Sequence, residues 1–179
     1  SPPRIYLSKD RLPKGVLVKD LFRDVLAELF FIERPYLKNS GRDLAGELKK
    51  FFWLHKNDAR WIYFPWRKTA LRIVSEELFT KIRTARNRNL ITEDEQKKFR
   101  NMVVGIVGMS VGSQIFSTLI ACGGTKYTKI ADFDRIELSN LNRMRATTLD
   151  IGVNKAITLA RSAWEIDPYA KIEVFASGL

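Results

Sequence analysis

The spacing of apolar residues predicts two amphipathic helices in the first sixty residues. VKDLFRDVLAELFFIERPYL, residues 18–37, repeats apolar positions every three to four residues and meets Pro35, as expected for a helix with one buried face. RDLAGELKKFFWLH, residues 42–55, repeats the pattern. The expected inward positions are Leu21, Val25, Leu26, Leu29 and Ile32 in the first helix and Leu44, Leu48, Phe51 and Phe52 in the second.

Two shorter patterns complete the first hundred residues. RWIYFPW, residues 60–66, alternates and carries aromatic residues, which is typical of a short strand, here ended by Pro65. Thr92 and Glu95 have the spacing of a capping box that opens the helix EDEQKKFRN. Residues 1–100 are therefore predicted to form a mainly helical module with one short strand.

The pattern changes after Arg100, which is the predicted domain boundary. MVVGIVGMSVGSQIFSTLIACGG, residues 102–124, predicts an apolar strand, a glycine turn and a helix ended by two glycines. KYTKIADFD and KIEVFA predict two further strands. Residues 101–179 are thus expected to form an α/β, Rossmann-like domain with a parallel sheet and right-handed crossovers. The sequence predicts only three strands of this sheet, so we expect an unpaired apolar edge near KIEVFA. Either association of the protein or cover by further sequence should protect this edge.

Composition narrows the class of protein. The 179 residues are 45% hydrophobic and 28% charged, which is typical of a globular chain. The longest apolar runs are too short to span a bilayer and the N-terminus has no apolar signal core, so we expect a cytoplasmic protein without a membrane anchor. One cysteine and one histidine exclude an intrachain disulfide and a Cys/His zinc cluster within the sequence.

The positive charge lies in the N-terminal part. Residues 1–100 hold 23 Lys+Arg against 13 Asp+Glu, whereas residues 101–179 hold 8 against 7. The cations are dispersed among helical periods, which favours a solvated face or a docking surface for an acidic protein over nucleic-acid binding. Trp53, Trp61 and Trp66 are expected in the core of the module or at its seam with the second part, with an aromatic ligand site as the less favoured alternative.

A candidate anion site follows the first strand of the second part. Gly108, Ser110 and Gly112 lie in a turn that opens a helix, and the free N–H groups and dipole of a helix N-terminus attract a phosphate. The turn lacks the third glycine of G-x-G-x-x-G and is a weak signal alone. Asp132 strengthens it, because an acid about 20 residues later at the end of the second strand is placed to bind a ribose. Nucleotide binding follows, with ATP and NAD both open.

A polar cluster after Asp132 separates these two nucleotides. A dehydrogenase needs no such cluster, whereas arginine and lysine together suit a polyphosphate and hold it extended while its α-phosphorus is attacked. The alternative is a polar turn in which these side chains only cap backbone groups. The cluster consists of Asp134, Ser139, Asn140, Asn142 and Arg143, with Lys155 twelve residues further on.

These segments resemble a known family. VVGIVGMSVGS, KIADFDRIELSNLNRMR, LDIGVNKA and EIDPYAKIEVF are similar to the first half of the ThiF/MoeB-type adenylyltransferases, the superfamily of the ubiquitin-activating enzymes. The resemblance implies that the glycine turn, Asp132, Asn140, Arg143 and Lys155 hold ATP. The implied reaction is adenylation of a carboxylate on a ubiquitin-like protein, a sulfur-carrier protein or a small acid.

The resemblance also implies features outside this cluster. Family members commonly form homodimers, and in several an arginine before the first strand reaches the neighbour's ATP, so Arg86 and Arg88 are candidates. A Mg²⁺ ligand is expected beyond residue 179, and we expect the sequence to be a fragment of a longer protein that is inactive by itself. The turn GMSVG is one residue shorter than the usual family turn, with Ser110 near the middle glycines.

Two other functions remain open. An NAD(P)-binding oxidoreductase would bind NAD and need no role for Arg143. A non-catalytic recruitment module would keep the nucleotide fold and bind its partner through the basic N-terminal part.

Overall fold

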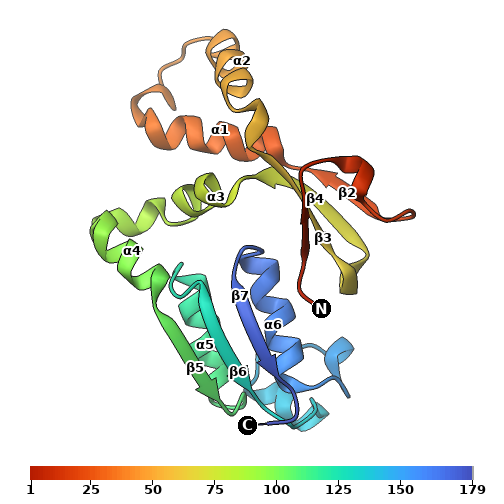
Figure 1. The fold of residues 1–179 in the computed structure, drawn as a ribbon. Helices are drawn as coiled ribbons and strands as arrows, with labels where there is room; N and C mark the ends of the chain where they lie inside the picture. The colour runs from red at the N-terminus through yellow and green to blue at the C-terminus, as the bar shows by residue number, and fades with distance from the viewer. Residues whose placement is uncertain (179) are drawn as a thin grey trace. The chain divides into compact units, whose positions relative to one another are not determined.

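The computed structural model describes residues 1–178 and divides the chain into two compact units (Figure 1). The first unit contains Ser1 and Pro3–Arg86. The second begins at Asn87 and also includes Pro2. Each unit has its own sheet and its own buried core.

A four-stranded sheet forms the centre of the first unit, in the order β1-β3-β4-β2. The antiparallel β3–β4 hairpin turns through a short 3-10 helix, Pro65–Arg67, and Lys68, whose φ is 47°. β1 pairs antiparallel with β3, and β2 pairs parallel with β4. The strands are β1 (Arg4–Tyr6), β2 (Leu17–Asp20), β3 (Ala59–Phe64) and β4 (Thr69–Val74).

Three helices accompany this sheet. α1 lies against β4 and α2 lies against α1, and Phe30 of α1 meets Phe51 of α2 edge to face, with 5.4 Å between ring centroids. Leu26, Leu29 and Ile62 are fully buried between helix and sheet. The helices are α1 (Phe22–Glu33), α2 (Ala45–Leu54) and α3 (Glu76–Arg83), and 3-10 helices cover Lys9–Arg11, Pro35–Leu37 and Lys56–Asp58.

The first unit differs from the mainly helical module that the sequence predicts. The two helices and the strand around Trp61 are present, but β1, β2 and β4 join that strand in a sheet. All four residues of β2 are exposed, so the strand carries no apolar alternation and arises only because β4 supplies hydrogen-bonding partners. Trp53 is also 65% exposed and does not belong to the core.

The second unit contains the predicted parallel sheet, in the order β5-β6-β7. The register pairs Val107 with Ala131 and Ala131 with Phe175 at the carboxyl ends of the strands. The sheet and its crossover helices confirm the α/β, Rossmann-like class. The elements are α4 (Glu93–Asn101), β5 (Val103–Val107), α5 (Gly112–Ala121), β6 (Tyr127–Ala131), α6 (Lys155–Ile166) and β7 (Lys171–Phe175), with 3-10 helices at Ala85–Asn89, Leu138–Asn142 and Thr148–Asp150.

The boundary between the units lies earlier than the change of sequence pattern after Arg100. The Arg100 side chain is 9% exposed and forms a 2.8 Å ion pair with Asp167, which follows α6 and precedes β7. A Cβ atom on Gly124 would lie 2.3 Å from the ring of Phe99, so α4 packs closely on the end of α5. These long-range contacts attach α4 to the second unit, although α4 is rich in charged residues like the first unit.

The capping box at the start of α4 is confirmed. Thr92 Oγ1 accepts from the N–H of Glu95, and the Glu95 carboxylate accepts from the N–H of Thr92 at 2.7 Å. Donation to the Glu95 carboxylate by the N–H of Thr92, and to a smaller extent by the Thr92 hydroxyl at 2.9 Å, lowers the pKa of Glu95 below its ordinary value.

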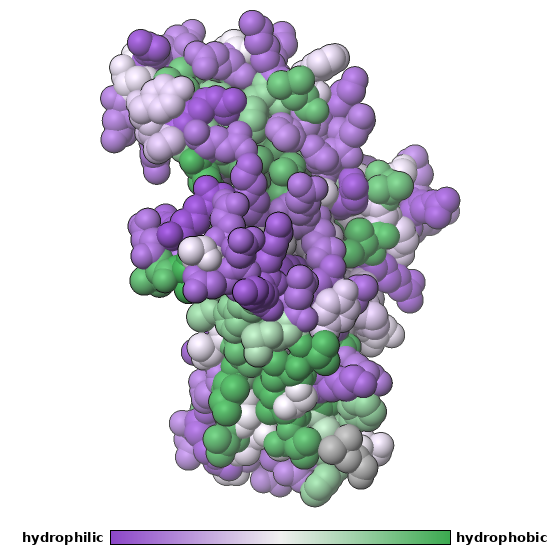
Figure 2. All heavy atoms as spheres, turned by 60° about the vertical axis from the view of Figure 1, so that its left-hand side comes forward, coloured by the Kyte–Doolittle hydropathy of each residue, from purple (hydrophilic) through white to green (hydrophobic). Residues whose placement is uncertain are grey.

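α5 and α6 pack against each other on one face of the parallel sheet (Figure 1). The side chains of Thr128 and Ile130 point to this covered face and are buried. Val103 and Val107 of β5 point the other way and are 68% and 69% exposed. Figure 2 shows a broad hydrophobic area in green on this unit.

Across residues 1–178, every helix falls short of the length and apolar character that a bilayer crossing requires.

Candidate functional site

The glycine turn connects β5 to α5. It contacts the end of β6 through Gly108 and the side chain of Ile106 in β5 through Gly112. Gly108 has φ of 83°, a conformation that strongly favours glycine, and its N–H donates to Ala131 O at 2.8 Å. Gly112 starts α5, and a Cβ atom there would lie 2.7 Å from Cγ2 of Ile106 in β5. The first glycine therefore makes the turn and the second lets the helix start close to the strand.

We expect Gly112→Ala to lower the free energy of unfolding by about 1–3 kcal/mol, because the added methyl overpacks the contact with the β-branched side chain of Ile106. Gly105→Ala is the matched control, since a Cβ atom on Gly105 meets no atom within 4 Å. Urea unfolding of both variants measures the difference. Equal stabilities would show that the helix start is not tightly packed.

The turn presents backbone donors at the start of α5. The N–H of Gly112 donates to Gly108 O and the N–H of Met109 donates to Asp132. Within the described chain, the N–H groups of Ser110 and Val111 have no hydrogen-bond partner. With the positive end of the helix dipole they form an arrangement that suits an anion.

Asp132 follows the end of β6 and is 9% exposed. Its Oδ2 accepts from the N–H of Met109 at 2.6 Å and its Oδ1 accepts from the N–H of Asp134 at 2.8 Å. The carboxylate therefore joins the end of β6 to the glycine turn. Each oxygen retains acceptor capacity for a ligand hydroxyl.

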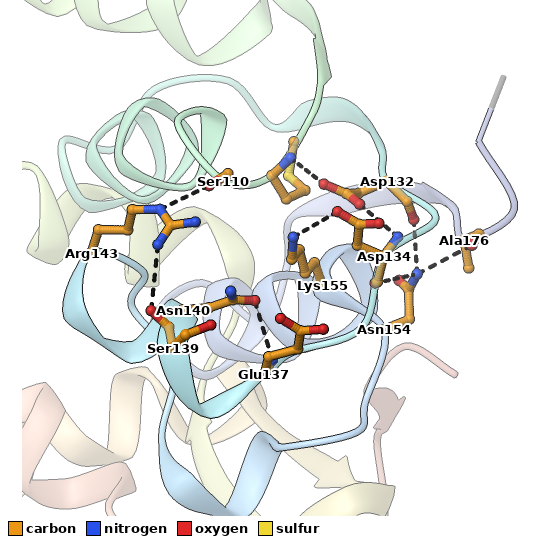
Figure 3. A network of polar contacts seen from close by, with 11 residues as sticks. Ser110, Asp132, Asp134, Glu137, Ser139, Asn140, Arg143, Asn154, Lys155 and Ala176 are labelled. Atoms are coloured by element: carbon orange, nitrogen blue, oxygen red, sulfur yellow. Dashed lines mark hydrogen bonds and ion pairs between the residues drawn. The ribbon is translucent and has the colours of Figure 1, made fainter.

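Arg143 brings a positive charge to the glycine turn (Figure 3). Its Nε donates to Ser110 Oγ at 3.2 Å, while Nη1 donates to Asn142 Oδ1 at 3.0 Å and to Ser139 O at 3.4 Å. Ser110 is thus the residue of the glycine turn that contacts the guanidinium. Residues 33 positions apart meet at one end of α5.

Lys155 places a second positive charge at the start of α6. Its Nζ donates to Asp134 Oδ2 at 2.7 Å, and the lysine side chain is 9% exposed against 52% for the acid. A lysine at the first residue of a helix is disfavoured by the dipole. A negative charge is therefore needed beside it, which Asp134 supplies in this structure and a phosphate can supply in a complex.

Asn140 is 5% exposed and stabilises the loop that carries Arg143. Its Oδ1 accepts from the N–H of Glu137 at 3.2 Å, while the N–H of Arg143 donates to Asn140 O at 3.2 Å. In this structure Asn140 orders the 3-10 turn at Leu138–Asn142.

Two residues of the network were missed by the sequence analysis. The Asn154 amide donates to the carbonyls of Asp132, Asp134 and Ala176, while its Oδ1 caps α6. Gln114 of α5 donates to Arg143 O at 2.8 Å. Asparagine is a favoured N-cap residue, so its place directly before α6 was a readable signal, whereas nothing in the sequence marks Gln114.

Arg86 and Arg88, the arginines predicted to reach a neighbour's ATP, precede α4 and β5. Arg88 forms an ion pair with Glu93 at 3.3 Å. Within residues 1–178, neither Arg86 nor Arg88 has a hydrogen bond or ion pair with the residues around the glycine turn. Their predicted role at a neighbour's ATP stays a prediction.

The arrangement can hold an anionic chain between two helix N-termini. α5 and α6 both begin at the carboxyl ends of parallel strands, where ligands of open α/β sheets bind. Arg143 lies at the first helix start and Lys155 at the second. Among the described residues there is no group of three or more His, Cys, Asp or Glu that suits a metal ion. The chemistry available here is charge neutralisation and positioning.

Sequence comparisons place these residues among known proteins. The ThiF family model matches residues 84–179. MT1398, an uncharacterized protein of Mycobacterium tuberculosis, is 41% identical over 158 residues, covering 88% of this chain and 21% of the relative. tRNA threonylcarbamoyladenosine dehydratase 2 of Saccharomyces cerevisiae is 34% identical over 100 residues, covering 55% of this chain and 22% of the relative. Ubiquitin-like modifier-activating enzyme 5 of Drosophila willistoni is 29% identical over 107 residues, covering 59% and 26%.

A solved structure shares the fold. The Escherichia coli tRNA N6-threonylcarbamoyladenosine dehydratase TcdA, crystallised with ATP, is 24% identical with a TM-score of 0.53, covering 55% of this chain and 41% of that chain. The chain spans between 21% and 26% of the length of the three relatives named above.

Proposed function

The chain belongs to the ThiF family, and from this premise we propose that it provides the nucleotide-binding half-site of an ATP-dependent adenylyltransferase that activates a carboxylate. The observation that carries the proposal is the approach of Arg143 to the glycine turn, 3.2 Å from Ser110 Oγ. A guanidinium at the N-terminus of a helix suits a phosphate chain. An NAD(P) oxidoreductase has no comparable need for it.

Each residue of the site has a role in this proposal. Gly108, Ser110 and Gly112 line the phosphates, Asp132 accepts from the ribose hydroxyls, and Arg143 and Lys155 bind the triphosphate. Asp134 releases Lys155 to the ligand, and Asn140 keeps the loop of Arg143 in place.

The chemistry is a displacement at the α-phosphorus. A carboxylate oxygen forms a new bond to this phosphorus, the bond to the bridging oxygen of the β-phosphate breaks, and pyrophosphate leaves with the electron pair. Arg143 and Lys155 neutralise the charge that develops on the phosphates and hold the chain extended. Among the described residues no acidic cluster suits Mg²⁺; the charge neutralisation by residues 1–178 comes from their cationic side chains and helix N-termini.

The carboxylate in this proposal belongs to the C-terminus of a ubiquitin-like or sulfur-carrier protein, or to a small acid. Relatives named as a ubiquitin-like modifier-activating enzyme and as a tRNA threonylcarbamoyladenosine dehydratase support this range. The same nucleotide site would serve each of these carboxylates, because its residues contact the nucleotide and not the acceptor.

Calorimetry with ATP, AMP and NAD⁺ on the chain tests the nucleotide. We expect ATP to bind more tightly than AMP, because the additional phosphates meet Arg143 and Lys155. TcdA was crystallised with both AMP and ATP, which makes these two ligands a suitable pair. Tighter binding of NAD⁺ than of ATP would contradict the proposal and favour an NAD(P)-binding oxidoreductase. Absence of nucleotide binding would favour the non-catalytic recruitment module.

We also propose that the chain self-associates through β5. β5 is an edge strand, and its Val103 and Val107 are exposed on the face of the sheet that α5 and α6 leave uncovered. β7 forms the other edge, but Lys171 and Glu173 are its exposed residues. β7 is thus an edge strand, as the sequence predicts for KIEVFA, but its exposed side chains are charged, and the exposed apolar side chains lie on β5.

Light scattering at micromolar concentration should report a mass above 20.7 kDa. Val103→Lys/Val107→Lys should return the mass to that of the monomer, because charges at an exposed edge oppose strand pairing. Leu149→Lys is the control, since Leu149 is 84% exposed away from β5. A monodisperse monomer of the parent chain would contradict the proposal.

A further inference from the structure

The first unit contains a cavity of about 620 Å³ between α1, α2 and β4. This volume is within the range of about 300–1,000 Å³ that is typical of ligand pockets. Its lining residues all belong to the first unit, and none of the residues around the glycine turn takes part. The cavity is therefore a site separate from the proposed nucleotide site.

Apolar side chains line part of the cavity. Phe22 is 4% exposed, Leu48 and Phe52 are partly buried, and Trp53 is 65% exposed. An exposed tryptophan beside a concave apolar surface is a common feature of protein interfaces. This part of the cavity suits an apolar side chain.

Four cations accompany these apolar residues. Arg23, Lys49, Lys56 and Arg72 line the cavity, and none of the described lining residues is acidic. Within residues 1–178, Arg23 and Lys49 have no ion pair. Like charges around one cavity repel each other, so an anionic ligand would relieve this repulsion.

Asp20 shows which anion the cavity suits. Its carboxylate accepts from Arg72 Nη1 at 3.0 Å and from the N–H of Phe22, the first residue of α1, at 3.1 Å. A carboxylate is thus already bound by a cation and a helix N-terminus at the border of this cavity. Arg23 and Lys49 offer the same kind of partner to carboxylates from another molecule.

The aromatic rings argue against a nucleic acid. Lys56 Nζ lies 4.7 Å above the ring of Trp53, and the guanidinium of Arg72 lies 4.8 Å from the ring of Phe22. Single-stranded nucleic acids bind to aromatic faces that are free to stack with bases, along a continuous basic track. Here side-chain cations occupy ring faces, and the 19 Lys+Arg of residues 1–86 are interspersed with 10 Asp+Glu.

We propose that this cavity binds an acidic peptide segment of a partner protein, in which an apolar side chain is flanked by carboxylates. The apolar side chain contacts Phe52 and Trp53, and the carboxylates pair with Arg23 and Lys49. This interaction does not depend on ATP or on the proposed adenylation.

The test measures fluorescence anisotropy of a labelled twelve-residue peptide with four glutamates around a central Leu-Phe pair, added to the whole chain. We expect Arg23→Ala/Lys49→Ala to weaken binding at least tenfold and 0.5 M salt to weaken it further. Arg11→Ala/Lys14→Ala is the matched control, because it removes the same charges from exposed positions outside the cavity. Circular dichroism confirms that both double variants are folded.

Three further ligands decide the chemistry of the partner. A peptide with glutamines in place of glutamates, and one with glycines in place of the Leu-Phe pair, should each bind at least tenfold more weakly. Equal binding of either peptide, or an equal effect of the two double variants, would overturn the proposal. Tighter binding of a single-stranded oligonucleotide that is lost in Arg23→Ala/Lys49→Ala would assign the cavity to nucleic acid instead.

Discussion

Replacing Arg143 by alanine should weaken ATP binding by about tenfold to a hundredfold and leave adenosine binding nearly unchanged. The substitution removes a charge-assisted contact to phosphates, which contributes about 1.5–3 kcal/mol. The guanidinium contacts Ser110, Ser139 and Asn142, and all three contacts are exposed. These neutral and exposed partners are easily exchanged for a phosphate, so the arginine is available to the ligand.

Calorimetry with ATP, AMP and adenosine measures this selectivity. Arg161→Ala is the matched control, because it removes the same charge from α6 without a contact to the glycine turn. The effect of Arg143→Ala on ATP should decrease at high salt, since the contact is open to solvent. Equal losses for ATP and adenosine would mean that Arg143 only stabilises the loop.

Asp132→Ala provides the opposite pattern in the same experiment. A ribose contact is common to ATP, AMP and adenosine, so all three should weaken alike. Asp132 also accepts from the N–H groups of Met109 and Asp134, so this variant should have a lower melting temperature than the parent. Loss of ATP binding with unchanged adenosine binding would show that Asp132 does not contact the ribose.

The largest effect on stability is expected at the ion pair between Arg100 and Asp167. The two side chains are 9% and 3% exposed and their charged atoms are 2.8 Å apart. Asp167→Ala leaves the charge of Arg100 buried without this carboxylate, which costs about 3–5 kcal/mol for a pair of this kind. The carboxylate also accepts from the N–H of Tyr169 at 3.0 Å, before β7.

Urea unfolding measures this loss against an exposed pair. Lys129 and Glu173 lie 3.2 Å apart with side chains 58% exposed, so Glu173→Ala should cost about 1 kcal/mol or less. Arg100→Met/Asp167→Leu should be less destabilised than Asp167→Ala, because apolar side chains then replace both members of the buried ion pair. Similar losses in the free energy of unfolding for Asp167→Ala and Glu173→Ala would show that the Arg100–Asp167 pair is as accessible to water as the exposed pair.

The local sequence determined the strand, turn and helix order of the second unit. An apolar run, a glycine that requires positive φ and an amphipathic repeat act over few residues, so the β5-α5-β6 order and the capping box at Thr92 were predictable. The placement of Asp132 beside the glycine turn followed from the same order, because adjacent parallel strands bring their carboxyl ends to one edge of the sheet. Only the family resemblance implied that Arg143 and the glycine turn share a ligand, and the contact between Arg143 and Ser110, 33 residues apart, came from the structure.

The tertiary structure alone decided the sheet of the first unit, the inclusion of α4 in the second unit and the exposure of Trp53. β2 carries no buried residue and exists because β4 pairs with it. α4 has the composition of the first unit, yet the buried pair of Arg100 and Asp167 joins it to the second. Asn154 connects Asp132, Asp134 and Ala176 through one amide. Such contacts depend on which distant segments meet in space, and periodicity along the chain carries no information about that choice.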